Sequence, residues 1–160
     1  MDATYTRPSP VTSALSLVAL AALGIGVVIA ELIVAMSAAS LAEAYPEFAS
    51  LHAPLLTAAI AFGVCVEVIL LITAFLVIAI ARGRMFDRAA SRLVDALVIT
   101  LIIATVIVAS VLPLLPGPPA LALAVFGGVI AGAAVTFVVL TLRSLLRQAT
   151  SMRLELDEVV

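Results

Sequence analysis

The sequence predicts an all-α membrane protein with four transmembrane helices in an antiparallel bundle. Three observations predict this class: a hydrophobic composition, four long apolar runs, and arginines that gather on one side of those runs. Of the 160 residues, 65% are hydrophobic and 11% are charged, and the mean hydropathy of +1.36 is far above that of soluble domains. Each run exceeds the roughly 20 residues that a helix needs to cross a hydrocarbon core of about 30 Å.

The four runs set the domain organisation. The expected membrane spans are residues 11–36, 55–81, 93–115 and 120–142. They form one transmembrane domain, residues 11–143, between an N-terminal tail (1–10) and a C-terminal tail (144–160). Small residues near Ala42 and Ala44 resemble a signal-peptide cleavage site. The first run is much longer than a signal-peptide core of about 7–15 residues, so we expect a retained first helix.

The connections that follow the first and third runs differ in kind. Ser37–Pro54 is half apolar, is interrupted by Pro46, and predicts a short interfacial helix or helical extension with Tyr45 and Phe48 at the level of the lipid headgroups. An ordered cap is a simpler interpretation of this segment than a ligand-binding lid. Pro116–Pro119 predicts a tight turn with a helix starting directly after it, because proline is tolerated in a first helical turn.

The arginines orient the chain. Four lie between the second and third runs, the other four lie in the two tails, and the two remaining connections have no lysine or arginine. Basic residues stay on the cytoplasmic side, so both termini and the loop between the second and third runs are expected in the cytoplasm. The basic loop consists of Arg82, Arg84, Arg88 and Arg92. We expect it to contact anionic lipid headgroups, and its shortness at the membrane plane argues against direct nucleic-acid binding.

Small residues recur every four positions on two of the expected helices. They are Ala22, Gly26 and Ala30 in the first run, and Ala124, Gly128, Gly132 and Thr136 in the fourth. Such stripes let helix backbones approach closely in lipid. They predict packing faces, and they leave open whether the partner is another helix of the chain or a second copy in a homo-oligomer.

Three carboxylates interrupt the apolar runs: Glu31, Glu67 and Asp95. Glu67 lies at the centre of its run, where a charge is costly and no basic residue is available. We expect it to be neutral and to donate a hydrogen bond to Thr105 or Thr136 on a neighbouring helix. It shares a helical stripe with Ala59 and Gly63, which predicts an inward-facing side chain.

The three acids do not carry the same interpretation. Glu31 shares a face with Gly24, so Glu31 and Glu67 could form part of a proton or cation path. The simpler interpretation is an interhelical hydrogen bond that holds the helices in register. Asp95, which follows Arg92 by three positions, is expected to form an ion pair with Arg143 at the cytoplasmic boundary.

The C-terminal tail predicts a cytoplasmic amphipathic helix. Apolar residues alternate four and three positions apart along it, at Leu145, Ala149, Met152, Leu156 and Val159. This apolar seam predicts either a helix lying on the basic loop or the membrane surface, or a docking face for another protein.

The sequence lacks the motifs that are typical of enzymes. There is no metalloprotease or serine-hydrolase motif, no phosphate-binding loop and no metal-ligand spacing. His52 is the single histidine and Cys65 the single cysteine. We expect no enzymatic activity, no cofactor and no metal.

Five segments resemble a bacterial membrane family known as domain of unknown function 2975, in its actinobacterial form. They are Tyr45–Leu56, Cys65–Glu67, Gly83–Asp87, Leu145–Thr150 and Glu155–Val159. The resemblance covers nearly the whole chain and implies the same four-helix topology, with no catalytic or binding residue assigned. Because relatives often lie beside a small helix-turn-helix regulator, it also implies a cytoplasmic DNA-binding partner.

Three functional hypotheses follow. The first is a membrane sensor or adaptor whose tail helix holds a cytoplasmic partner. The second is a small oligomeric channel or transporter that uses Glu67 and Glu31. The third is a structural accessory subunit that packs through the face of Gly128 and Gly132.

Overall fold

The computed structural model describes residues 10–44, 46, 49–82, 88–115 and 119–157. Four long helices fill this part of the chain, and it contains no strand. They are α1 (Pro10–Ala44), α2 (Ala49–Ala81), α3 (Arg88–Val111) and α4 (Pro119–Asp157), with the 3-10 turn η2 (Leu112–Leu114) after α3. The prediction of an all-helical protein is confirmed.

All four helices are long and apolar enough to cross a membrane. The candidate spans are Pro10–Ala38, Ser50–Ala81, Ala89–Leu114 and Ala122–Leu145. Threonine hydroxyls within them donate to the carbonyl oxygen four residues earlier, at 2.7–2.9 Å. Each hydroxyl is thereby satisfied within its own helix, as an apolar solvent requires. The chain is a multi-pass membrane protein, and its outer surfaces contact lipid.

The segment between the first two spans is largely helical, as one of the two expected alternatives required. Residues 37–44 continue α1, and α2 already begins at Ala49, so Pro54 lies inside α2. The helical extension is therefore the alternative that the structure shows, and α2 begins six residues before the expected start of the second span at residue 55. A proline this close to a helix start removes a single intrahelical hydrogen bond. Tyr45 and Phe48 lie outside the described residues.

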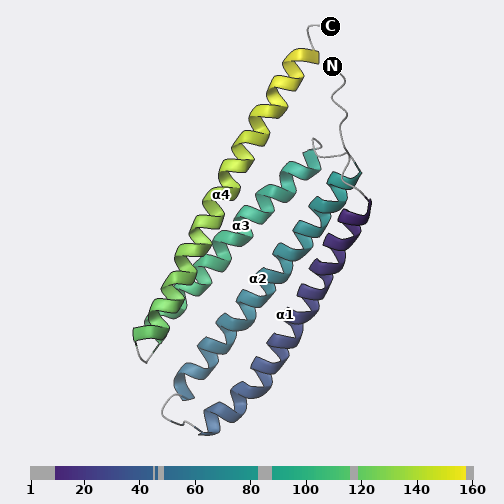
Figure 1. Ribbon diagram of the computed structural model, residues 1–160. Helices are drawn as coiled ribbons and strands as arrows, with labels where there is room; N and C mark the ends of the chain where they lie inside the picture. Colours follow the sequence, from purple (N-terminus) through teal and green to yellow (C-terminus); the bar gives the residue numbers. More distant parts are fainter. Residues whose placement is uncertain (1–9, 45, 47–48, 83–87, 116–118, 158–160) are drawn as a thin grey trace.

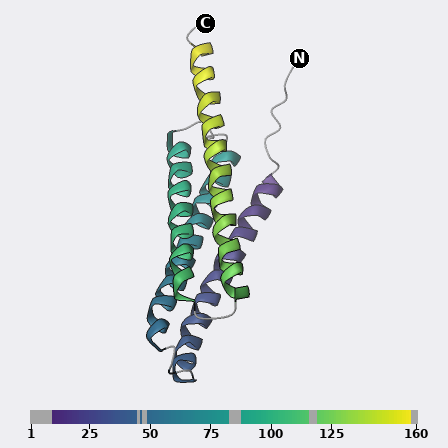
Figure 2. The ribbon, with the colours of Figure 1, turned by 90° about the vertical axis from the view of Figure 1, so that its left-hand side faces the viewer.

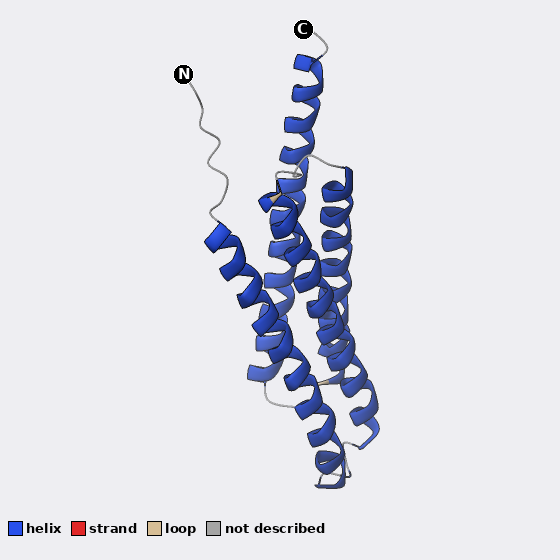
Figure 3. Ribbon diagram, turned by 90° about the vertical axis from the view of Figure 1, so that its right-hand side faces the viewer, coloured by secondary structure: helices blue, strands red, loops and turns tan. Residues whose placement is uncertain are grey.

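Consecutive helices run in opposite directions and pack against their neighbours in sequence (Figure 1). Among the described residues, extensive packing is confined to the pairs α1–α2, α2–α3 and α3–α4. This differs from a bundle in which all four helices share one interior. None of the most apolar stretch of α1 is buried, and Figure 3 shows the N-terminal end of α1 leaning away from the other helices.

Few side chains are buried at all. The buried positions of the described residues lie on α2, α3 and α4, and they are Gly63, Cys65, Ile72, Ala90, Val98, Ala104 and Thr136. Large apolar residues face outward on every helix, as expected where lipid is the solvent.

Helix α4 is longer than its membrane span. The span ends at Leu145, but the helix continues without a break to Asp157. Figures 1 and 2 show this last part of α4 projecting beyond the ends of the other helices, at the end of the molecule where the N-terminus also lies. The expected tail helix is therefore the direct continuation of α4.

Candidate functional site

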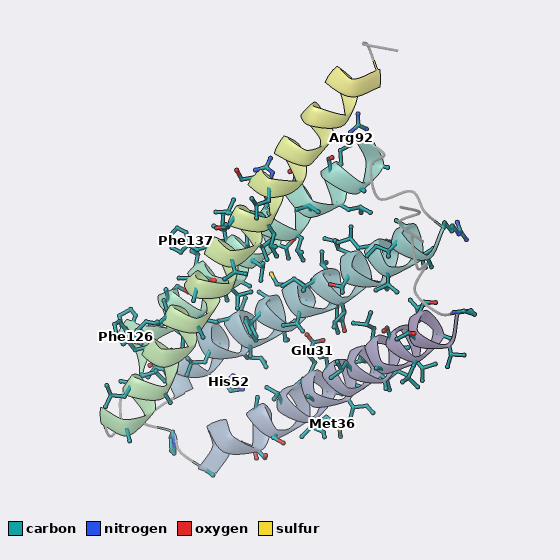
Figure 4. The ribbon with its side chains drawn as sticks, turned by 45° about the horizontal axis from the view of Figure 1, so that its top comes forward. Glu31, Met36, His52, Arg92, Phe126 and Phe137 are labelled. Carbon is teal, nitrogen blue, oxygen red and sulfur yellow. The ribbon has the colours of Figure 1, made fainter. Side chains whose placement is uncertain are left out.

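The carboxyl group of Glu31 on α1 reaches the surface of α2. It lies against Gly63 of α2, and Figure 4 shows Glu31 between the two helices. A Cβ atom added at Gly63 would come 2.7 Å from Glu31 Cδ and 3.0 Å from Cγ. The contact therefore depends on the absence of a side chain at Gly63.

One oxygen of Glu31 is enclosed in this contact. Oε1 is buried and has no hydrogen-bond partner among the described residues, although the residue as a whole is only half-buried. A buried polar atom without a partner is costly, and such atoms often mark functional positions. Glu31 is thus the strongest candidate for chemistry inside the membrane.

Glu67 lies one helical turn beyond Gly63 on α2. The predicted stripe of Ala59, Gly63 and Glu67 does not face inward as a whole, because Gly63 is buried, Glu67 is half-buried and Ala59 is exposed. The expected hydrogen bond to a threonine is also not observed among the described residues. The hydroxyls of Thr105 and Thr136 donate within their own helices, to Leu101 and Gly132.

Asp95 and Arg143 tie α3 to α4. Arg143 Nε lies 2.5 Å from Asp95 Oδ1, so the ion pair expected from the sequence is confirmed. It lies two residues before Leu145, where the apolar span of α4 ends and the projecting part begins. The pair therefore fixes α4 to α3 at the base of the projection.

The small-residue stripe of α4 divides into two halves. Gly132 packs against Thr105 of α3, whose Oγ1 would lie 2.7 Å from an added Cβ atom, and Thr136 is buried. Nothing lies within 4 Å of an added Cβ at Gly128, and Ala124 is exposed. The half with Gly132 and Thr136 is an intramolecular packing face, and the half with Ala124 and Gly128 faces outward. On α1, Gly24 and Gly26 are equally open.

The basic loop and the tail are described only in part. Arg82 and Arg92 are exposed, Arg88 begins α3, and Arg84 lies outside the described residues. Leu145 is exposed. Ala149, Met152 and Leu156 belong to α4, but their side chains, like all of Val159, lie outside the description.

Within the described part of the chain, no group of three or more His, Cys, Asp or Glu side chains is placed to hold a metal ion. Cys65 is a buried free thiol, and His52 is half-buried near the start of α2. The arrangement offers an unpartnered carboxyl oxygen at Glu31 and an ion pair between Asp95 and Arg143.

The contact between Glu31 and Gly63 was missed from the sequence, although a signal for it exists. In an antiparallel helical hairpin, residues at equal distances from the connection lie opposite one another. Glu31 and Gly63 are equally far from Glu47 along the chain, and Asp95 and Arg143 are equally far from Pro119. Counting outward from each connection places the members of each pair at a similar depth, without identifying the exact partner residue.

The comparison with protein families identifies the chain. Residues 36–160 match the family described as "Protein of unknown function (DUF2975)". The chain belongs to the DUF2975 family. The DUF2975 match contains Gly63, Glu67, Asp95 and Arg143 but begins after Glu31. No curated protein and no solved structure matches the chain.

Proposed function

We propose that this DUF2975 protein is a non-enzymatic membrane adaptor whose projecting end of α4 binds a cytoplasmic protein. The observation that carries the proposal is the continuity of α4 from its apolar span to Asp157. From Leu145 to Asp157 the helix extends about 18 Å beyond the span, at 1.5 Å per residue. Crossing the membrane does not require this length.

The sequence of the projecting part supports a docking role. Its apolar seam of Leu145, Ala149, Met152 and Leu156 occupies one face, and Arg147 and Leu154 lie near the opposite face. An amphipathic helix of this kind inserts its apolar face into a groove of a partner protein. The arginines in the loop before α3 and in the tail support an orientation in a bacterial inner membrane with this end of the molecule on the cytoplasmic side.

The ion pair at the base of the projection supports a sensing role. Arg143 belongs to the same continuous helix as the docking segment, and its partner Asp95 belongs to α3. A change in the packing of α3 on α4 would redirect the projecting helix as a rigid rod. The membrane-embedded part then detects the signal, and the projecting helix transmits the change to its partner. We propose that this partner is a transcriptional regulator.

The experiment compares the full chain in lipid nanodiscs with a chain that ends at Arg143. Cytosolic proteins retained by each are identified by mass spectrometry, and a candidate regulator is then purified and titrated. The proposal predicts saturable binding of one soluble protein to the full chain and loss of that binding on truncation. Equal binding to both chains would contradict it.

Lateral association is a second candidate function, which the outward half of the α4 stripe favours. Gly128 and Ala124 are open on the surface of the span, where a second copy or another membrane protein could approach closely. Cross-linking in native membranes, with Gly128→Ile as the disruptive variant, tests this role. A monomer in both proteins, with no neighbour cross-linked, would exclude it.

A further inference from the structure

Helix α1 is the least firmly held part of the described fold. It packs extensively on α2 alone, and none of the most apolar stretch of its span is buried. The contact of Glu31 with Gly63 brings a polar side chain into this sparse interface. The way the Glu31 side chain lies against Gly63 therefore affects how closely α1 and α2 associate.

The chemistry of the contact favours a protonated carboxyl group. The surface offered by α2 at Gly63 is helix backbone, because glycine has no side chain. Backbone N–H groups inside a helix are already bonded to carbonyl oxygens, whereas each carbonyl oxygen has a second lone pair. Only a protonated carboxyl group can donate to such an oxygen, since a carboxylate is an acceptor alone.

The other ionisable groups near this interface do not supply a positive partner within the spans. On α2 they are Glu67, one turn beyond Gly63, His52 near the helix start, Cys65 and, at the far end, the exposed Arg82. On α1 the remaining described acid is Glu43, close to the end of the helix. Within the spans, the described residues of α1 and α2 therefore offer Glu31 no arginine or lysine as a partner.

We propose that Glu31 and Gly63 form a proton-binding site that controls the association of α1 with α2. With a proton bound, the carboxyl group lies on the Gly63 backbone and the two helices are close. Loss of the proton leaves a carboxylate facing acceptor groups in an apolar medium. The side chain then leaves Gly63, and α1 separates from α2 at this level.

The test measures the separation of α1 and α2 as a function of pH. Spin labels are placed at Ser37→Cys on α1 and Thr57→Cys on α2, both exposed positions, in a Cys65→Ser background in nanodiscs. Dipolar broadening is recorded from roughly pH 5 to pH 9, a range that covers the titration of buried carboxyl groups. The proposal predicts that the labels move apart as pH rises.

Two variants act in opposite directions. Glu31→Gln cannot lose a proton, so the labels stay close at every pH. Gly63→Ala places a methyl group where the carboxyl group lies, so the labels stay apart at every pH. Adding Glu31→Ala to Gly63→Ala removes the collision and should bring the labels together again. Circular dichroism at both pH extremes verifies that each variant is folded.

Control variants assign the effect to Glu31. Glu67→Gln and His52→Gln should keep the pH-dependent movement, and the infrared carbonyl band of a protonated carboxyl group should weaken in Glu31→Gln at low pH. An unchanged pH response in Glu31→Gln would overturn the proposal. So would a separation that does not change with pH, or one that follows sodium concentration at constant pH.

Discussion

Arg143 Nε on α4 lies 2.5 Å from Asp95 Oδ1 on α3, at the point where α4 leaves the membrane span. Both side chains remain partly accessible, with 29% of Arg143 and 35% of Asp95 exposed. Exposure of this degree allows solvent to screen the charges. The pair therefore orients α4 on α3 more than it stabilises the fold.

A double-mutant cycle measures this pair. We expect Asp95→Asn and Arg143→Gln each to lower the free energy of unfolding, with a coupling energy of about 0.5–1 kcal/mol between them. The free energies come from reversible denaturation in mixed micelles at low and high salt, and the coupling should fall at high salt. Fully additive single effects would show that the contact contributes nothing.

The two glycines of the α4 stripe should respond differently to the same change. Gly132→Ala brings a Cβ atom to 2.7 Å from Thr105 Oγ1, and that hydroxyl is held by a 2.8 Å hydrogen bond to Leu101. We expect a loss of about 1–3 kcal/mol, as for other overpacked sites. Gly128→Ala meets nothing within 4 Å and should leave stability equal or raise it by up to about 1 kcal/mol.

The control for this comparison removes the obstacle on α3. In a Thr105→Ala background, Gly132→Ala should cost much less than in the native chain. Equal effects at Gly128 and Gly132 would mean that α3 does not pack on α4 as described. A loss at Gly128 that grows with the protein-to-lipid ratio would reveal a neighbouring copy on the outward face.

The proposed orientation of the chain, with both termini in the cytoplasm, predicts a labelling pattern. In a Cys65→Ser background, Ser40→Cys near the end of α1 should react with a membrane-impermeant maleimide in intact spheroplasts, because the first connection carries no basic residue. Thr150→Cys on the projecting end of α4 should react only after permeabilisation. The reverse pattern would place both termini outside the cytoplasm.

The adaptor account also predicts an absence of ion flux that depends on Glu67. Glu31 lies on the α1–α2 contact, and extensive helix packing in the described residues joins sequence neighbours only. Within the described residues, one copy therefore has no interior that all four helices share. Proteoliposomes with a pH-sensitive dye should show equal proton leak for the native chain and Glu67→Gln. A leak above that of empty vesicles that disappears in Glu67→Gln would favour the channel.

The four helices of this fold were predictable because membrane helices are recognisable in a sequence by their length and hydropathy. The sequence also placed Asp95 beside Arg143, since two boundary residues of one hairpin have the same depth. Helix ends were predicted less well. The second span was expected to begin at residue 55, directly after Pro54, but α2 begins at Ala49 and has Pro54 inside it.

The lateral arrangement of the helices was not predictable in the same way. Small-residue stripes mark faces that allow close approach without identifying what approaches them. The stripe of α4 therefore contained both Gly132, which packs on Thr105, and Gly128, which faces outward. Glu31 was assigned to a shared interior for the same reason, although its actual neighbour is the backbone at Gly63.

The most direct test of the docking role compares two leucines on the projecting end of α4. Leu156 belongs to the apolar seam, and Leu154 lies about 200° away around the helix, near the opposite face. Each is changed to Glu in the full chain in nanodiscs, and binding of the captured cytosolic partner is titrated. The account predicts that Leu156→Glu weakens binding at least about tenfold, a loss of 1.4 kcal/mol or more, and that Leu154→Glu does not. Equal binding by the native chain and Leu156→Glu, or equal losses in both variants, would contradict it.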